Sequence, residues 1–86
     1  MSKPVTYKLI EPFKWDEKQY DEIVINPPKG KHIRKLGESP SVGDLLDVAA
    51  KCSGVLPRVF DEMESADCLA VGEVIGDFLS SGREIG

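Results

Sequence analysis

Two segments near the N-terminus alternate apolar and polar side chains or collect β-branched ones. Val5–Leu9 alternates with period two, and Tyr20–Asn26 contains the run Ile23–Ile25, patterns that are typical of half-buried β-strands. The charged residues at 16–18 are typical of a turn between them. Pro27–Pro28 ends the second strand, because proline cannot donate a hydrogen bond to a strand ladder. We therefore expect one antiparallel β-hairpin over about residues 5–26.

Helical periodicity replaces the strand pattern after the two prolines. Ser41 followed by Asp44 predicts a capping box at a helix start, and Gly54 predicts the end of that helix. Four helical segments are expected: Lys29–Leu36, Ser41–Gly54, Pro57–Met63 and Ser65 through Leu79, the last ending at Ser81–Gly82. The chain is then an α+β protein with one domain, residues 1–86. Its N-terminal antiparallel hairpin packs on three to four short helices that make up about residues 29–82.

The last helix is strongly apolar, and a chain of this size has little other material to cover it. Its polar face is narrow and holds Glu73, Asp77, Ser80 and Glu84, and a broad apolar arc lies opposite. Either the hairpin covers the whole arc, or part of it binds a partner. If a partner binds, we expect contacts at the edges of the arc or in the preceding short helix. The candidate partner-binding residues are Phe60, Leu69, Val74 and Phe78.

Composition and charge narrow the class of protein. The chain has 86 residues and a net charge of −4, which is suitable for one small globular domain. No apolar run approaches the length of a membrane span, and no secretory signal is recognisable, so we expect no membrane association. Residues 1–43 carry eight basic and six acidic side chains, and residues 44–86 carry three and nine. The best helices are therefore acidic, which argues against a nucleic-acid partner.

Candidate chemistry is sparse. His32 lies among basic residues, where a solvated surface histidine is the expected state. Cys52 and Cys68 lack zinc-ligand spacing, and two cysteines indicate reduced thiols in a cytoplasmic compartment. Gly72 and Gly76 form a G-x-x-x-G spacing, which in this context favours close approach of a neighbouring element. We expect no enzyme activity, no cofactor and no metal site.

The order of short motifs along the chain resembles that of a known family. The first motif is a strand followed by prolines and a short helix that ends in Arg-x-Leu. A second helix and a Ser-Gly-hydrophobic turn come next. A pair of aspartates beside apolar residues and a closing apolar helix complete the order. These motifs are Ile25–Leu36, Asp44–Leu46, Ser53–Val55, Val59–Asp61, Asp67–Leu69 and Val74–Leu79. Over about residues 5–80, they resemble the small E-type phage tail assembly chaperones of Mu-like and related contractile-tailed phages and prophages. In relatives, glycine often occupies the hairpin turn where this chain has Asp16–Lys18.

The resemblance implies a function without catalysis. Such chaperones bind and protect the tape measure protein before the tail tube polymerises around it. The implied location is the cytoplasm of the bacterial host, with no copy in the mature virion. The implied partners are the tape measure protein and a longer, frameshifted version of the chain itself, and self-association remains open.

Two other functions are compatible with the residues alone. The basic cluster around Lys29–Lys35 leaves open a small DNA-binding regulator, although the helix that follows it is poorly charged for a major groove. A minor structural tail protein is the other alternative. Steep salt dependence of DNA binding would indicate the regulator, and presence in purified particles would indicate the structural protein.

Overall fold

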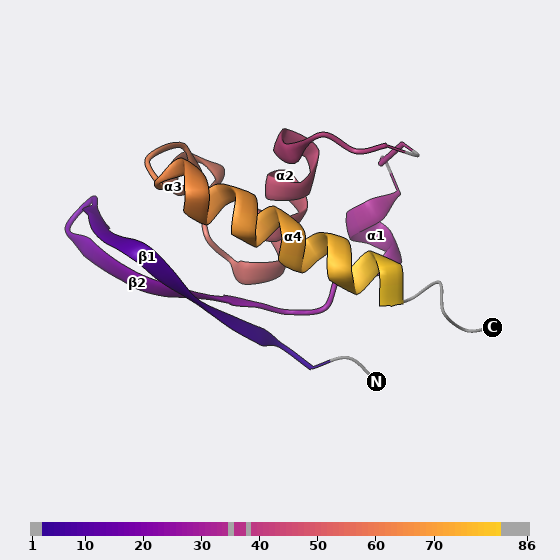
Figure 1. Ribbon diagram of the computed structural model, residues 1–86, viewed down its shortest axis with the longest axis horizontal. Helices are drawn as coiled ribbons and strands as arrows, with labels where there is room; N and C mark the ends of the chain where they lie inside the picture. The colour runs from indigo at the N-terminus through magenta and orange to yellow at the C-terminus, as the bar shows by residue number, and fades with distance from the viewer. Residues whose placement is uncertain (1–2, 35, 38, 82–86) are drawn as a thin grey trace.

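The computed structural model describes residues 3–34, 36–37 and 39–81, and it forms a β-hairpin followed by four helices (Figure 1). The elements are β1 (Val5–Trp15), β2 (Lys18–Ile25), α1 (Gly30–Ile33), α2 (Val42–Ser53), α3 (Pro57–Asp61) and α4 (Ser65–Ser81). The predicted α+β class, with an N-terminal antiparallel hairpin packed on short helices, is confirmed. None of the helices in this described part of the chain is long and apolar enough to cross a membrane.

The hairpin spans the predicted residues, but its first strand is longer than the alternating pattern predicts. β1 continues past Leu9 to Trp15, and its partners run from Val5 opposite Ile25 to Trp15 opposite Lys18. The pattern missed the second half of β1 because the pairing is interrupted between Lys8 and Phe13. The four β1 residues 9–12 lie opposite a single β2 residue, Asp21. Because of this bulge, the alternation of inward and outward side chains does not continue through Pro12.

The two-residue turn of the hairpin has an unusual composition. Asp16 and Glu17 both have positive φ angles, 50° and 64°, as a type I′ turn requires. Glycine or asparagine normally occupies such positions, because other L-residues are strained in the left-handed region. The predicted turn is therefore present, and it forms without glycine.

The helix boundaries follow the local signals except at the ends of the two short helices, α1 and α3, of which α3 ends at Asp61 and not at Met63. Ser41 Oγ accepts from the Asp44 N–H at 3.1 Å, and an Asp44 carboxylate oxygen accepts from the Ser41 N–H at 3.0 Å, which confirms the capping box. Gly54 ends α2 in the left-handed conformation, with φ 74°. α1 is only four residues long instead of extending to Leu36, since one helical turn without a long apolar stripe has little to propagate it.

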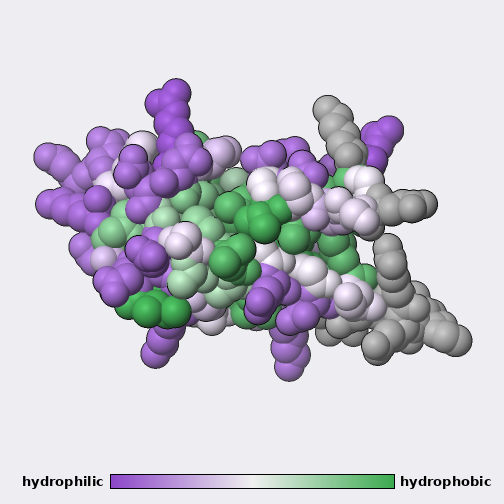
Figure 2. Space-filling model, turned by 45° about the horizontal axis from the view of Figure 1, so that its top comes forward, coloured by the Kyte–Doolittle hydropathy of each residue, from purple (hydrophilic) through white to green (hydrophobic). Residues whose placement is uncertain are grey.

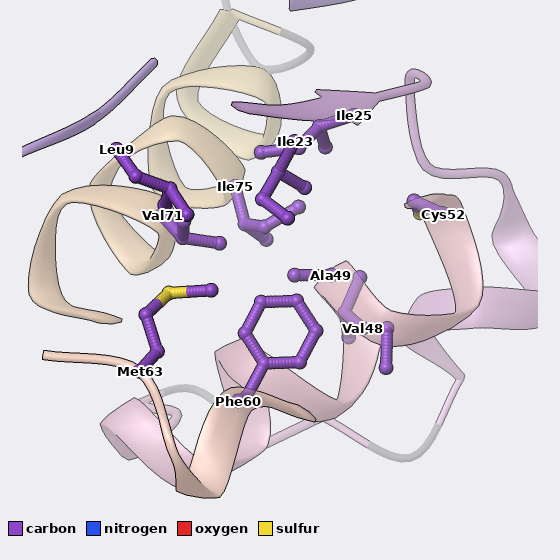
Figure 3. Close-up of a cluster of buried hydrophobic side chains, with 11 residues drawn as sticks. Leu9, Ile23, Ile25, Val48, Ala49, Cys52, Phe60, Met63, Val71 and Ile75 are labelled. Atoms are coloured by element: carbon purple, nitrogen blue, oxygen red, sulfur yellow. The ribbon is translucent and has the colours of Figure 1, made fainter. Parts of the chain in front are cut away.

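One hydrophobic core joins the hairpin to the helices (Figure 3). α4 packs on β1 and on α2, and α2 also contacts α3, β2 and α1. Figure 3 shows the Phe60 ring lying between Met63 and the α2 side chains, facing Ile75. The buried hydrophobic cluster consists of Leu9, Ile23, Ile25, Val48, Ala49, Ala50, Cys52, Phe60, Met63, Val71 and Ile75.

Candidate partner-binding surface

The structure separates the four candidate binding residues by burial. Phe60 is 3% exposed and belongs to the core, whereas Leu69 is 54% exposed on α4. Val74 and Phe78 are half-buried and pack against the core from α4. Of the four, Leu69 is therefore the side chain most available to a partner without a change in the fold.

Leu69 does not share a face of α4 with the other two α4 candidates. At about 100° per residue, Val74 and Phe78 lie roughly 140° and 180° around the helix from Leu69. The three residues therefore do not form one continuous strip. Leu69 instead lies on the side of Glu73, Asp77 and Ser80, which are all exposed as the polar-face pattern predicts. Glu84, the fourth predicted member of that face, lies outside the described residues.

Leu69 belongs to a groove between α2 and α4. The groove has a volume of about 500 Å³ and an open, shallow shape. Its lining comes from both helices: Val42, Leu45, Leu69, Gly72, Glu73, Gly76, Asp77 and Ser80. Figure 2 shows apolar side chains gathered near the centre of this face of the molecule, with hydrophilic side chains around them. Val42 is 44% exposed, so apolar surface reaches the groove from α2 as well as from α4.

The two glycines of the G-x-x-x-G spacing have different surroundings. A Cβ atom at Gly72 would lie 3.8 Å from Leu45 Cδ1, an ordinary van der Waals distance, so α2 contacts α4 there without an approach that requires glycine. A Cβ atom at Gly76 would meet no atom of the described residues within 4 Å. The second glycine thus leaves open space along α4 in the floor of the groove.

A buried carboxylate, noted from the sequence only as part of a family motif, fixes α4 to the hairpin. Asp67 is fully buried. One of its oxygens accepts from the Tyr7 hydroxyl at 2.6 Å and from the Ile10 N–H at 2.8 Å, and the other accepts from the Glu11 N–H at 3.1 Å. Ile10 and Glu11 lie in the stretch where β1 leaves its regular pairing with β2. The irregularity therefore frees two backbone donors that Asp67 satisfies.

These hydrogen bonds shift the pKa of both side chains. Burial by itself raises the pKa of Asp67, but the three hydrogen bonds outweigh burial and lower it below 3.8. The hydrogen bond to Asp67, followed by burial and the nearby negative charge, raises the pKa of Tyr7 to about 12. Asp67 is therefore ionised and Tyr7 neutral at neutral pH, and both states favour the contact. The sequence does contain a signal for this contact: Asp67 is a carboxylate on the otherwise apolar side of the predicted last helix.

Neither thiol has the surroundings of a reactive cysteine. Burial raises the pKa of Cys52, and burial together with nearby carboxylates raises the pKa of Cys68, so both remain protonated at neutral pH. His32 is half-buried and not simply solvated: its Nδ1 accepts from the Lys29 N–H at 2.9 Å and lies 3.6 Å from Cys52 Sγ. Within the described residues, no group of three or more His, Cys, Asp or Glu side chains is arranged to hold a metal ion.

The fold and this surface define a small α+β protein with an open apolar groove between two helices. The family model for phage tail assembly chaperone proteins, described as "E, or 41 or 14", matches residues 6–80 and so includes most of every strand and helix. The chain belongs to this family of phage tail assembly chaperones. No curated protein matches it significantly, and neither does any solved structure.

Proposed function

We propose that this protein binds the tape measure protein and keeps its apolar segments from aggregating until the tail tube polymerises around it. Membership of the tail assembly chaperone family over residues 6–80 is the observation that carries this proposal. A chaperone that holds its client needs apolar surface that a folded molecule leaves accessible. The exposed Leu69 and Val42 in the groove between α2 and α4 meet that requirement.

The proposed action is binding alone, with no catalytic step. The proposed location is the cytoplasm of the bacterial host before assembly is complete, and the protein leaves before the virion matures. A longer, frameshifted version of the chain is proposed as a second partner. Mass spectrometry of purified particles tests the location: the proposal expects the chain to be absent, and stoichiometric amounts would identify a structural tail protein instead.

Co-expression with the tape measure protein of the same phage tests the proposed binding. We expect the tape measure protein to stay soluble and to co-purify with the chaperone, and to precipitate without it. Failure of the wild-type protein to retain or solubilise its client contradicts the proposed function.

A pair of leucine substitutions tests whether Leu69 contributes. Leu69→Asp should weaken co-purification and leave the thermal transition close to that of the wild type, because the side chain is largely exposed. Leu56→Asp is the matched control, since Leu56 is 57% exposed and lies outside the groove. Equal retention of the client by both folded variants would place the binding surface elsewhere on the protein.

A further inference from the structure

We propose that the groove between α2 and α4 binds one positively charged amphipathic helix, which lays its apolar side along α4 between Leu69 and Ser80 and its basic residues against Glu73 and Asp77. This inference rests on the proposed function and deepens it by giving the chemistry of the client segment. It follows from the shape, the lining and the charge of the groove.

The groove fits a helix better than an extended strand or a small molecule. Its α4 side runs from Leu69 to Ser80, a length of about 16 Å at 1.5 Å per residue, or three helical turns. Its open, shallow form does not enclose a small ligand. Both walls are helices, so no strand edge is available in the lining for an added strand. A helix with apolar residues at positions i, i+4 and i+7 matches the spacing of such a surface.

The floor at Gly76 allows close approach to the α4 backbone. The absence of any atom within 4 Å of a Cβ placed there means that this space is not used to pack the described part of the protein itself. At Gly72, by contrast, such a Cβ atom would already be in van der Waals contact with Leu45. A docking helix therefore has room beside Gly76, between the exposed Leu69 at one end and Ser80 at the other.

Charge selects the kind of helix. The described residues that line the groove include two carboxylates, Glu73 and Asp77, and no basic side chain. These two residues are four positions apart and both are exposed, so they present a pair of negative charges on successive turns of α4. A partner with lysine or arginine at two positions four residues apart complements that pair. A second copy of this chain would present the same two carboxylates, which makes the groove a poor match for itself.

Two synthetic helical peptides test the charge preference with the full-length protein. The peptides share one leucine stripe and differ only in carrying lysine or glutamate at the two flanking positions. We expect the lysine peptide to bind about tenfold more tightly at low salt, because two solvent-exposed ion pairs replace two like-charge contacts. The preference should decline as the salt concentration rises. Equal binding of the two peptides, or binding of neither, overturns the inference.

Protein variants assign the preference to the groove. The double variant Glu73→Lys, Asp77→Lys should bind the glutamate peptide more tightly than the lysine peptide. The matched control Asp61→Lys, Glu62→Lys changes the net charge equally at exposed positions outside the groove and should keep the wild-type preference. Reversal of the preference in the control variant as well would mean that net charge and not the groove selects the peptide.

A third variant fills the groove without weakening the fold. Gly76→Leu replaces a poor helix former by a good one, at a position where no atom of residues 3–34, 36–37 and 39–81 lies within 4 Å of the first side-chain carbon. Its thermal transition should therefore not fall. Binding of the lysine peptide should nevertheless decrease about tenfold or more, because the new side chain occupies the docking space. Unchanged binding by a folded Gly76→Leu variant overturns the inference.

The same variants separate this inference from the proposed function. If the tape measure protein binds the wild type and both groove variants equally, the chaperone function stands and the groove is not its binding site. If the wild type does not bind the tape measure protein, the proposed function fails, and the peptide measurements still decide what the groove binds.

Discussion

At the scale of single residues, Asp67 connects two elements that lie far apart in the sequence, β1 and α4. A fully buried carboxylate is strongly unfavourable without partners, and this one accepts three hydrogen bonds from Tyr7 and from the β1 backbone. All three donors lie in β1, and Asp67 lies in the first turn of α4. The contact therefore sets the position at which the long helix crosses the hairpin.

Substitution of the acceptor, Asp67, should cost more stability than substitution of one of its donors, Tyr7. Asp67→Asn keeps the volume of the side chain but turns an amide NH₂ towards backbone donors, so we expect the free energy of unfolding to fall by about 2–4 kcal/mol. Tyr7→Phe removes one of the three donors and should cost about 1–2 kcal/mol. Urea unfolding measures both values. A loss below about 0.5 kcal/mol for Asp67→Asn would contradict the structural role assigned to the carboxylate.

The pKa shifts predict how stability depends on pH. Because the pKa of Asp67 is lowered below 3.8 in the folded protein, the unfolded chain binds more protons in acid, and stability should fall as the pH decreases below about 3.8. Because the pKa of Tyr7 is raised from 10.0 to about 12, the folded protein retains a proton that the unfolded chain releases. Stability should therefore also fall as the pH rises from about 10 to 12.

Unfolding in urea across the pH range, with Tyr7→Phe as the comparison, measures these contributions. The two proteins differ only at residue 7, so the difference between their stability curves isolates the contribution of Tyr7. The wild type should lose more stability than Tyr7→Phe between about pH 10 and pH 12. Parallel curves for the two proteins over that interval would be inconsistent with the hydrogen bond from Tyr7 to Asp67.

At the scale of elements, local signals were sufficient for most of the fold. Ser41 with Asp44 predicted the start of α2, and Gly54 predicted its end, because capping depends on residues within one helical turn. The alternating pattern identified the hairpin but not the full length of β1, since the interrupted pairing around Pro12 depends on contacts with α4. The Tyr7–Asp67 contact joins residues 60 positions apart, and no local pattern specifies such a distance.

The candidate binding site was predictable to a lesser degree. The helical wheel of α4 correctly placed Glu73, Asp77 and Ser80 on an exposed face and Leu69 towards it. It did not reveal the contribution of Val42 and Leu45, because the groove exists only where α2 packs against α4. Burial of Phe60 likewise depends on how α3 closes the core.

The hairpin turn contains residues that are less favourable than glycine for its backbone conformation. Glu17→Gly should raise the free energy of unfolding by about 0.5–1 kcal/mol, because glycine adopts the positive φ of 64° without strain. Lys14→Gly is the control, at an exposed position in β1 with no positive φ, and it should lower stability by about 0.5–1 kcal/mol. Destabilisation by Glu17→Gly in thermal unfolding would mean that the Glu17 side chain contributes more than its backbone strain costs.

At the scale of the whole molecule, the hairpin and the helices depend on each other for burial. An isolated two-stranded hairpin is marginally stable in water, and here Leu9, Ile23 and Ile25 contribute to the same core as Val71 and Ile75 of α4. Neither part can lose its contacts with the other without exposing apolar surface. We therefore expect the chain to unfold as one cooperative unit.

Two spectroscopic probes distinguish the parts in a denaturant titration. Trp15 is the single tryptophan and lies beside the hairpin turn, so its fluorescence reports on the hairpin, whereas far-ultraviolet circular dichroism reports mainly on α2 and α4. The two transitions should coincide in the wild type. Ile75→Ala, at a fully buried position, should move both midpoints together to lower denaturant through a loss of about 2–4 kcal/mol. Ile10→Ala, at a side chain that is 67% exposed, should leave both nearly unchanged. If Ile75→Ala shifts the helical signal and not the fluorescence, the hairpin folds independently of α4, and the core does not couple the two parts.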